Sequence, residues 1–157
     1  MPLSKVKEYL DSNNIKYVIV QHSPAYTAQE IAGRAHISGK MLAKTVMIKV
    51  DGKMAMAVLP ASFKISFDHL KEALGMEKVR LAYEQEFMDK FPDCEVGAMP
   101  PFGNLYGIDV YVAESLVQDK EIAFNACSHS ELIKMNYKDF EKIVKPKILK
   151  FSTQVKA

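Results

Sequence analysis

Residues 42–59 read LAKTVMIKVDGKMAMAVL, two apolar runs separated by the dipeptide Asp51-Gly52. Asp-Gly readily adopts the positive φ angles that a two-residue hairpin turn requires. The stretch therefore predicts a β-hairpin with strands over residues 42–50 and 53–59. Its turn also fixes the register, in which Val50 faces Lys53 and Lys44 faces Leu59.

Side chains alternate across a strand, so this register divides the hairpin into two faces. Both faces are apolar away from the turn, which predicts that other elements cover both. One face carries Lys44, Val46, Ile48, Val50, Ala55, Ala57 and Leu59, and the other carries Thr45, Met47, Lys49, Met54, Met56 and Val58.

The sequence on either side of the hairpin alternates between helical and strand patterns. Before it we expect a helix from Ser4 to Asn13, a strand over 15–21, a turn at 22–24 and a helix from the capping box Thr27–Glu30 to about Arg34. After it the patterns predict helices over 66–75, 84–91 and 136–145, and strands over 79–82, 109–113, 121–124 and 131–135.

These connections are mostly hairpin-like, with helices at uneven intervals. They predict an α+β fold with a mixed, largely antiparallel sheet and surrounding helices. No repeat or long linker divides the 157 residues, so we expect one domain over 1–157, with residues 147–157 as a frayed tail.

Composition excludes several classes of protein. The chain is 48% apolar and 25% charged, it begins without an apolar leader, and no apolar run approaches the length of a membrane span. We therefore expect a cytoplasmic protein. Cys94 and Cys127 lie outside any CxxC pair, which disfavours zinc and predicts two reduced thiols.

The charge is unevenly distributed. The net charge is only +2, but the segment from Glu131 onward holds seven lysines against three acidic residues, a net charge of +4. A basic C-terminal segment suits a phosphate backbone, although a solvated helix face with a charged tail gives the same pattern.

Two features point to a binding site. Lys44 lies on an otherwise aliphatic face, where alanines leave space, so it suits the edge of a small pocket; a lysine extending to solvent at a strand end is the alternative. Residues 95–107 combine Gly97 with Pro100 and Pro101, and such a stiff loop can recognise a small polar group through its backbone. An ordinary connecting loop is the alternative there.

Lys44-Thr45 at the start of a hairpin, followed by Gly97-x-x-x-Pro101, resembles the YbaK family of prolyl-tRNA-synthetase-associated editing domains. The resemblance runs from the first helix to about Pro146. It is strengthened by further matches in the same order: His22-x-Pro24, Glu30, Asp51-Gly52, Pro101-Phe102-Gly103 and Phe124-Asn125-Ala126.

The resemblance implies a free-standing hydrolase that removes a wrong, small amino acid (alanine, cysteine or serine) from proline tRNA or a related tRNA. It implies no metal or organic cofactor, no membrane, and a tRNA partner with a synthetase as a second candidate. The catalytic candidates are Lys44, Gly97 and Pro101. The substrate-binding candidates are Thr45, Ala98, Met99, Phe102, Asn125, Cys127, His129 and His22.

The residues suit hydrolysis by water. Ser128-His129-Ser130 is a weak candidate for a nucleophilic group, because adjacent side chains point apart and no acid is placed to orient His129. Lys44 can stabilise charge on the ester carbonyl or bind the terminal phosphate, and the alanine-lined hollow can exclude proline by size.

The chain departs from the family pattern at two positions. Asn125-Ala126-Cys127 replaces Asn-Ala-Gly, and Thr45 stands where some relatives carry asparagine. Both changes bear on amino-acid specificity. Two other functions fit the same features: a module that binds tRNA or a synthetase without hydrolysis, and a regulatory domain that binds a small molecule.

Overall fold

The structure is a computed structural model, and it describes residues 4–22, 41–92, 94–95 and 98–154. The strands are β1 (Tyr17–Gln21), β2 (Leu42–Val50), β3 (Lys53–Pro60), β4 (Phe63–Ile65), β5 (Val79–Leu81), β6 (Asp109–Ala113), β7 (Glu121–Asn125), β8 (Glu131–Asn136), β9 (Lys147–Leu149) and β10 (Ser152–Gln154). The helices are α1 (Ser4–Ser12), α3 (Phe67–Leu74), α4 (Glu84–Phe87), α5 (Glu114–Val117) and α6 (Tyr137–Val144), with 3-10 turns η1 (Met88–Lys90) and η2 (Gly103–Leu105).

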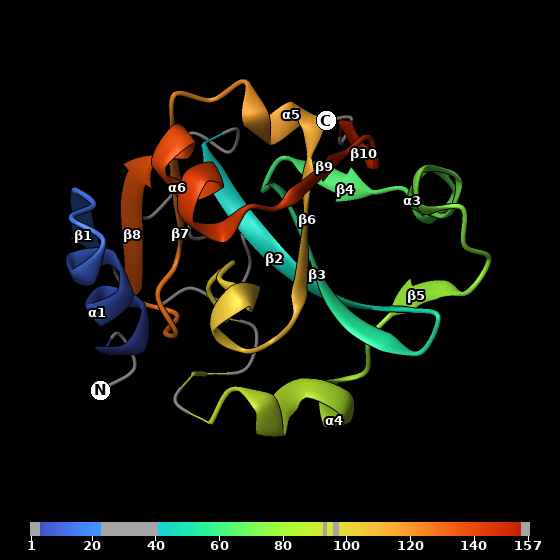
Figure 1. The fold of residues 1–157 in the computed structure, drawn as a ribbon, viewed down its shortest axis with the longest axis horizontal. Helices are drawn as coiled ribbons and strands as arrows, with labels where there is room; N and C mark the ends of the chain where they lie inside the picture. Colours follow the sequence, from blue (N-terminus) through green and yellow to red (C-terminus); the bar gives the residue numbers. More distant parts are fainter. Residues whose placement is uncertain (1–3, 23–40, 93, 96–97, 155–157) are drawn as a thin grey trace.

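One large mixed sheet organises the described chain (Figure 1). Its strands follow the order β1-β8-β7-β2-β3-β6-β9, β5 pairs with β2 outside this path, and β4 and β10 form a separate two-stranded sheet. The pairs β2–β7, β3–β6 and β6–β9 are parallel and the others are antiparallel. The predicted α+β class, with a mixed and largely antiparallel sheet, is confirmed.

The hairpin of β2 and β3 has the predicted register. Val50 pairs with Lys53 and Lys44 pairs with Leu59. Both faces are covered, as predicted. Side chains from α1 and α6, together with Phe87, Phe91, Met99 and Phe102, pack on the face that carries Met47 and Met56. Side chains from β4, α3 and Phe151 pack on the face that carries Lys44.

Local signals correctly placed several helices. In α1, Val6 and Leu10 are buried on one face. The side chain of Ser66 accepts a hydrogen bond from the His69 amide at the start of α3, and Gly75 ends that helix with φ of 66°. A left-handed residue is the usual end of a helix, and glycine adopts it without a steric penalty.

Other predictions were wrong or incomplete. The predicted helix over 84–91 is α-helical only to Phe87 and continues as a 3-10 turn. The tail predicted to fray forms β9 and β10, because Phe151 between them is fully buried and anchors it. The short elements β4 and α5 carry little periodic signal and were not predicted. The turn at 22–24, apart from His22, and the Thr27–Glu30 capping box lie outside the described residues.

Candidate functional site

Lys44 lies at the point along β2 where the neighbouring strand on one side changes from β7 to β5. Along one side β2 pairs with β3 from Ala43 to Val50. Along the other side it pairs with β7 at Leu42 and Ala43, and with β5 only from Ile48 onward. Within the described chain no strand therefore pairs with Lys44, Thr45 or Val46 on that side. Points where neighbouring strands separate are common positions for ligand sites.

The Lys44 ammonium is half-buried. Its side chain forms no ion pair with any residue that the structure describes. Burial alone lowers the pKa of Lys44 below its ordinary value, because moving a charge out of water disfavours the charged form. A lysine held in this way can supply positive charge to a ligand without first releasing a protein carboxylate.

This burial predicts a pH-dependent difference between the wild type and Lys44→Met. Because the pKa of Lys44 is lowered on folding, the unfolded chain binds more protons at pH values between the folded and unfolded pKa, so stability rises with pH there. We expect the wild type to gain stability relative to Lys44→Met between about pH 7.5 and about pH 10. Urea unfolding at both pH values measures this, with Lys53→Met as the exposed control. A difference that does not change with pH would show that Lys44 is fully solvated.

The register of β2 and β7 indicates that Asn125 lies near Lys44. Phe124 of β7 pairs in parallel with Ala43, and the same register continued by one residue puts Asn125 next to Lys44. Neighbouring side chains in adjacent strands point to the same face. The Asn125 side-chain oxygen is buried and has no hydrogen-bond partner among the described residues. A buried acceptor without a partner is costly unless a ligand donates to it.

The loop that contains the predicted Gly97-x-x-x-Pro101 motif is attached to the segment after β7. The Cys127 amide donates to the Ala98 carbonyl at 3.0 Å, and the Glu95 amide donates to the Cys127 carbonyl at 2.9 Å. Asn125 and Cys127 are two residues apart, so these bonds bring the loop toward the Lys44 end of β2. Gly97 itself lies outside the described residues.

Cys94 and Cys127 form a disulfide in the structure, so the prediction of two reduced thiols is wrong. The cysteines are 33 residues apart in sequence, and their Cα atoms lie only 4.2 Å apart. Sequence spacing does not reveal such proximity. Cys127 also has φ of 67°, a left-handed conformation that costs a non-glycine residue roughly 1–2 kcal/mol.

The environment of His129 also differs from the prediction, which placed no acid near it. Its backbone amide donates to the Glu95 carboxylate at 2.9 Å, and its Nε2 lies 3.9 Å from the same oxygen. The sequence pattern did not reveal Glu95, because it is 34 residues away from His129. The neighbouring hydroxyls of Ser128 and Ser130 lie 3.5 Å apart.

Several candidate residues are too buried to contact a substrate through their side chains. Phe102 and Ala98 are fully buried, and Met99 is almost so. The prediction that Phe102 binds substrate is therefore corrected: its ring packs against Tyr9, Phe124 and Phe140 in the core and fixes the loop from beneath. Among the other candidates, Thr45 and His22 are partly exposed, whereas Pro101 is buried.

The alanines predicted to line a hollow are packed within the described part of the chain. Ala55 and Ala57 share the face of Lys44, as expected, but both are buried. The aromatic side chains of Phe63, Phe67 and Phe151 belong to the cluster that covers this face. The sequence cannot show this, because these aromatic residues come from β4, α3 and the segment before β10.

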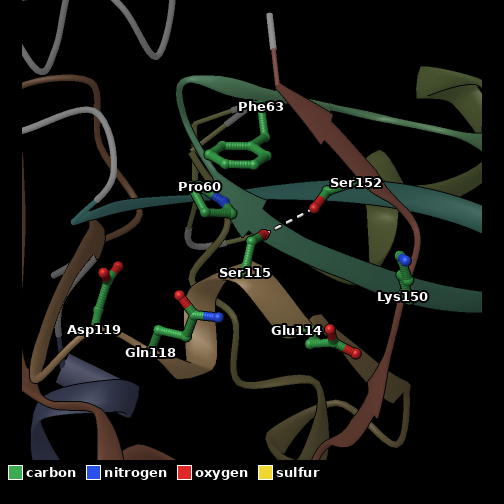
Figure 2. Close-up of a pocket in the computed structure, with 8 residues that line it drawn as sticks. All are labelled: Pro60, Phe63, Glu114, Ser115, Gln118, Asp119, Lys150 and Ser152. Carbon is green, nitrogen blue, oxygen red and sulfur yellow. Dashed lines mark hydrogen bonds between the residues drawn. The ribbon is translucent and has the colours of Figure 1, made fainter.

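A cavity of about 330 Å³ lies at the Pro60 end of the hairpin (Figure 2). Pro60, which lines this cavity, pairs with Ala43 of β2. Figure 2 shows the Phe63 ring next to Pro60, and the hydroxyls of Ser115 and Ser152 joined by a hydrogen bond of 2.8 Å. The remaining lining residues are Glu114, Gln118, Asp119 and Lys150. Sequence patterns did not indicate this cavity, because its walls come from three distant segments.

The described residues contain no cluster of three or more histidine, cysteine, aspartate or glutamate side chains that could hold a metal ion. None of the helices in this part of the chain has the length and apolar character needed to cross a membrane.

Comparisons with known proteins place the chain in a family. The model of the aminoacyl-tRNA editing domain family matches residues 22–143. The prolyl-tRNA editing protein ProX of Acetoanaerobium sticklandii is 27% identical over 142 residues, covering 87% of this chain and 86% of ProX. A proline–tRNA ligase of Halalkalibacterium halodurans is 26% identical over 113 residues, which cover 72% of this chain but only 19% of the ligase.

Solved structures show the same fold. The crystal structure of a hypothetical protein superposes with a TM-score of 0.84 at 20% identity, covering 95% of this chain and 99% of that protein. A proposed trans-editing enzyme for prolyl-tRNA synthetase superposes with a TM-score of 0.80 at 16% identity, covering 97% of both chains. With most of its length matched by the family model, this chain belongs to the aminoacyl-tRNA editing domain family.

Proposed function

We propose that this protein is a cytoplasmic trans-editing hydrolase that removes a wrong, small amino acid from tRNA, with alanine on proline tRNA as the leading substrate. One observation carries the proposal: the half-buried Lys44 ammonium has no counter-ion among the described residues, at a point of β2 where the β2–β7 register brings in Asn125, whose side-chain oxygen is buried without a partner. Family membership and the relation to ProX support the choice of substrate class.

In the proposed reaction, water attacks the carbonyl carbon of the aminoacyl ester. Negative charge then develops on the carbonyl oxygen, and the Lys44 ammonium stabilises it or holds the terminal phosphate. The Asn125 oxygen accepts a hydrogen bond from the substrate's α-ammonium group. The ester C–O bond breaks, the free amino acid leaves, and the ribose oxygen takes the proton; the neighbouring ribose hydroxyl assists this transfer.

The selection of small amino acids is assigned to the junction of the loop with the segment after β7. Ala98 and Cys127 are joined there by a backbone hydrogen bond, and both are buried. Because both side chains are buried, only the backbone here can meet the substrate, and this backbone cannot move aside for a larger amino acid without breaking that bond. Steric exclusion of proline can be strong, whereas a missing methylene alone changes binding by only about 1–3 kcal/mol.

Deacylation across a panel of tRNAs tests the proposal. Proline, alanine, cysteine and serine are each attached to proline tRNA, alanine is also attached to its own tRNA, and release of the amino acid is followed. We expect release of a small amino acid from proline tRNA and none of proline. Binding of tRNA without release of any amino acid above the uncatalysed rate would favour the binding module instead.

The basic C-terminal segment is proposed to contact the tRNA backbone. Lys138 and Lys142 are both exposed, and they lie one helical turn apart on α6. Neutralising both to glutamine should reduce the slope of log binding constant against log salt by roughly 1.5, because each phosphate contact contributes about 0.7–0.9. Binding measured over a range of salt concentrations gives the slope, with the exposed pair Lys53 and Lys64 as the matched control. Equal slopes for the wild type and the α6 variant would exclude this contact.

A further inference from the structure

The cavity in Figure 2 combines an apolar wall with hydrogen-bonding groups from other segments. Pro60 of β3 and the Phe63 ring of β4 form the apolar wall. The polar groups include Ser115 of α5, Gln118 directly after α5, and Ser152 of β10. The volume of about 330 Å³ falls in the range of small-molecule sites, roughly 300–1,000 Å³. The proposed reaction uses none of these groups.

The polar side chains of this cavity retain hydrogen-bonding capacity for a ligand. The Ser115 and Ser152 hydroxyls lie 2.8 Å apart, and within the described part of the chain neither makes another hydrogen bond. A hydroxyl has one donor and two acceptor sites, so the pair still offers one O–H and several lone pairs. Gln118 is exposed, and its amide can both donate and accept. These groups suit the edge of a flat polar ring.

The charges around the cavity limit the class of ligand. Glu114 and Asp119 face one lysine, Lys150, which gives the lining a formal charge of −1. Such a lining disfavours a ligand with several negative charges, because the carboxylates repel it. A carboxylate can accept hydrogen bonds from ribose hydroxyls. Lys150 is exposed and forms no ion pair with a described residue, so it can meet a single phosphate.

The apolar wall of the cavity belongs to the Lys44 end of the hairpin. Pro60 pairs with Ala43, the residue before Lys44. Opposite α-carbons in such a pair are roughly 5 Å apart and consecutive ones about 3.8 Å, so the Pro60 and Lys44 α-carbons are within about 7 Å. Phe63 packs against the cluster that contains Leu59, the partner of Lys44, so the wall lies on the Lys44 face of the sheet.

We infer that this cavity binds one nucleotide of a single strand, the nucleotide that precedes the aminoacylated adenosine of tRNA. In tRNA that nucleotide is a cytidine. Its base stacks on the Phe63 ring, as unpaired bases do on aromatic side chains. Gln118 and the serine hydroxyls contact the base edge, Glu114 accepts from the ribose, and Lys150 contacts the phosphate. The choice of strand rests on the proposed function, whereas the nucleoside chemistry rests on the cavity alone.

A titration of ¹⁵N-labelled protein tests this site without any hydrolysis. The probes are the dinucleotide cytidylyl-(3′→5′)-adenosine, adenosine, and cytidine monophosphate. We expect the dinucleotide to shift the Gln118 side-chain amide and the backbone amides of Ser115 and Ser152, and adenosine to leave them unchanged. Cytidine monophosphate should shift the same signals at about tenfold lower affinity, because it lacks the second contact. No shift at these residues with the dinucleotide would overturn the site. Equal affinity for both cytidine probes would overturn the assignment to the tRNA strand.

Side-chain variants test the assigned contacts. Phe63→Leu should weaken dinucleotide binding about tenfold by removing the stacking surface, and Phe63→Tyr should retain it. Phe67→Leu changes an equally placed ring of the same cluster outside the cavity and is the matched control. Gln118→Ala should weaken binding about fivefold, with the exposed Gln85→Ala as its control. Affinities of Phe63→Leu and Gln118→Ala equal to those of their controls would overturn the inference.

Deacylation then tests the consequence for the substrate. In the wild type, the alanyl ester of the dinucleotide should have a KM about tenfold lower than the alanyl ester of adenosine. Gln118→Ala should reduce this ratio to about two, and Gln85→Ala should keep it. A ratio near one in the wild type would overturn the subsite. If neither ester releases alanine above the uncatalysed rate, the proposed function fails, and the titration still decides whether the cavity binds the nucleotide.

Discussion

Lys44→Ala is expected to lower kcat/KM for deacylation by roughly 10²–10³-fold, the usual effect of removing one group that stabilises developing charge. The ammonium is half-buried and forms no ion pair in the described structure, so its charge is available to the substrate. Water that enters the space left in Lys44→Ala stabilises the developing negative charge less well, because its dipoles are not held in place. Single-turnover release of alanine from proline tRNA measures the loss directly.

Two further lysine variants distinguish the loss of the positive charge from a general loss of structure. Lys44→Arg keeps the positive charge but places it in a larger planar group, and we expect partial activity. Lys53→Ala removes an exposed lysine from the other strand of the same hairpin, and we expect full activity. A Lys44→Ala protein that retains wild-type activity would remove this residue from the mechanism.

Phe102→Ala is expected to lower the free energy of unfolding by about 3–5 kcal/mol, as for other large buried aromatic residues. The ring is fully buried. It meets Tyr9, Phe124 and Phe140 in edge-to-face contacts, with ring centroids 5.3–6.2 Å apart. Its loss would leave a cavity beneath the loop and remove these aromatic contacts.

Urea unfolding of the variant measures this stability. Phe102→Leu keeps most of the buried volume and should cost markedly less, and Tyr83→Ala removes an exposed ring as the matched control. At a temperature where Phe102→Ala remains folded, its KM should rise more than its kcat falls. A stability loss no larger than that of Tyr83→Ala would mean that Phe102 is not the anchor of the loop.

Local chemistry in the sequence was enough to predict the centre of the fold. Asp51-Gly52 set the turn, and the alternation on either side set the pairing of Lys44 with Leu59. Ser66 and Gly75 act on the backbone of α3 within a few residues, so their effect was visible without the rest of the molecule.

Features that depend on distant contacts could not be predicted in this way. The strands β9 and β10 form because Phe151 is buried in the core, not because their own sequence favours strands. The burial of Ala55 and Ala57 has the same origin, since aromatic residues from other segments belong to the cluster around them. The Cys94–Cys127 bridge and the approach of Glu95 to His129 each join positions more than thirty residues apart.

The resemblance to a known family supplied what neither pattern nor periodicity could, namely the chemistry expected at Lys44. The structure adds the neighbours: Asn125 through the β2–β7 register, and the loop through Cys127 and Ala98. Together these residues form the proposed site, which can be tested before the natural substrate is identified.

A titration of ¹⁵N-labelled protein with a stable amide analogue of 3′-alanyl-adenosine tests the central claim most directly. We predict that the largest chemical-shift changes occur at the Asn125 side chain and at the amides of Lys44 and Ala98, and that Lys44→Ala weakens binding. Changes confined to the lysines of α6 or to the cavity in Figure 2, with Lys44 and Asn125 unaffected, would contradict the proposed site.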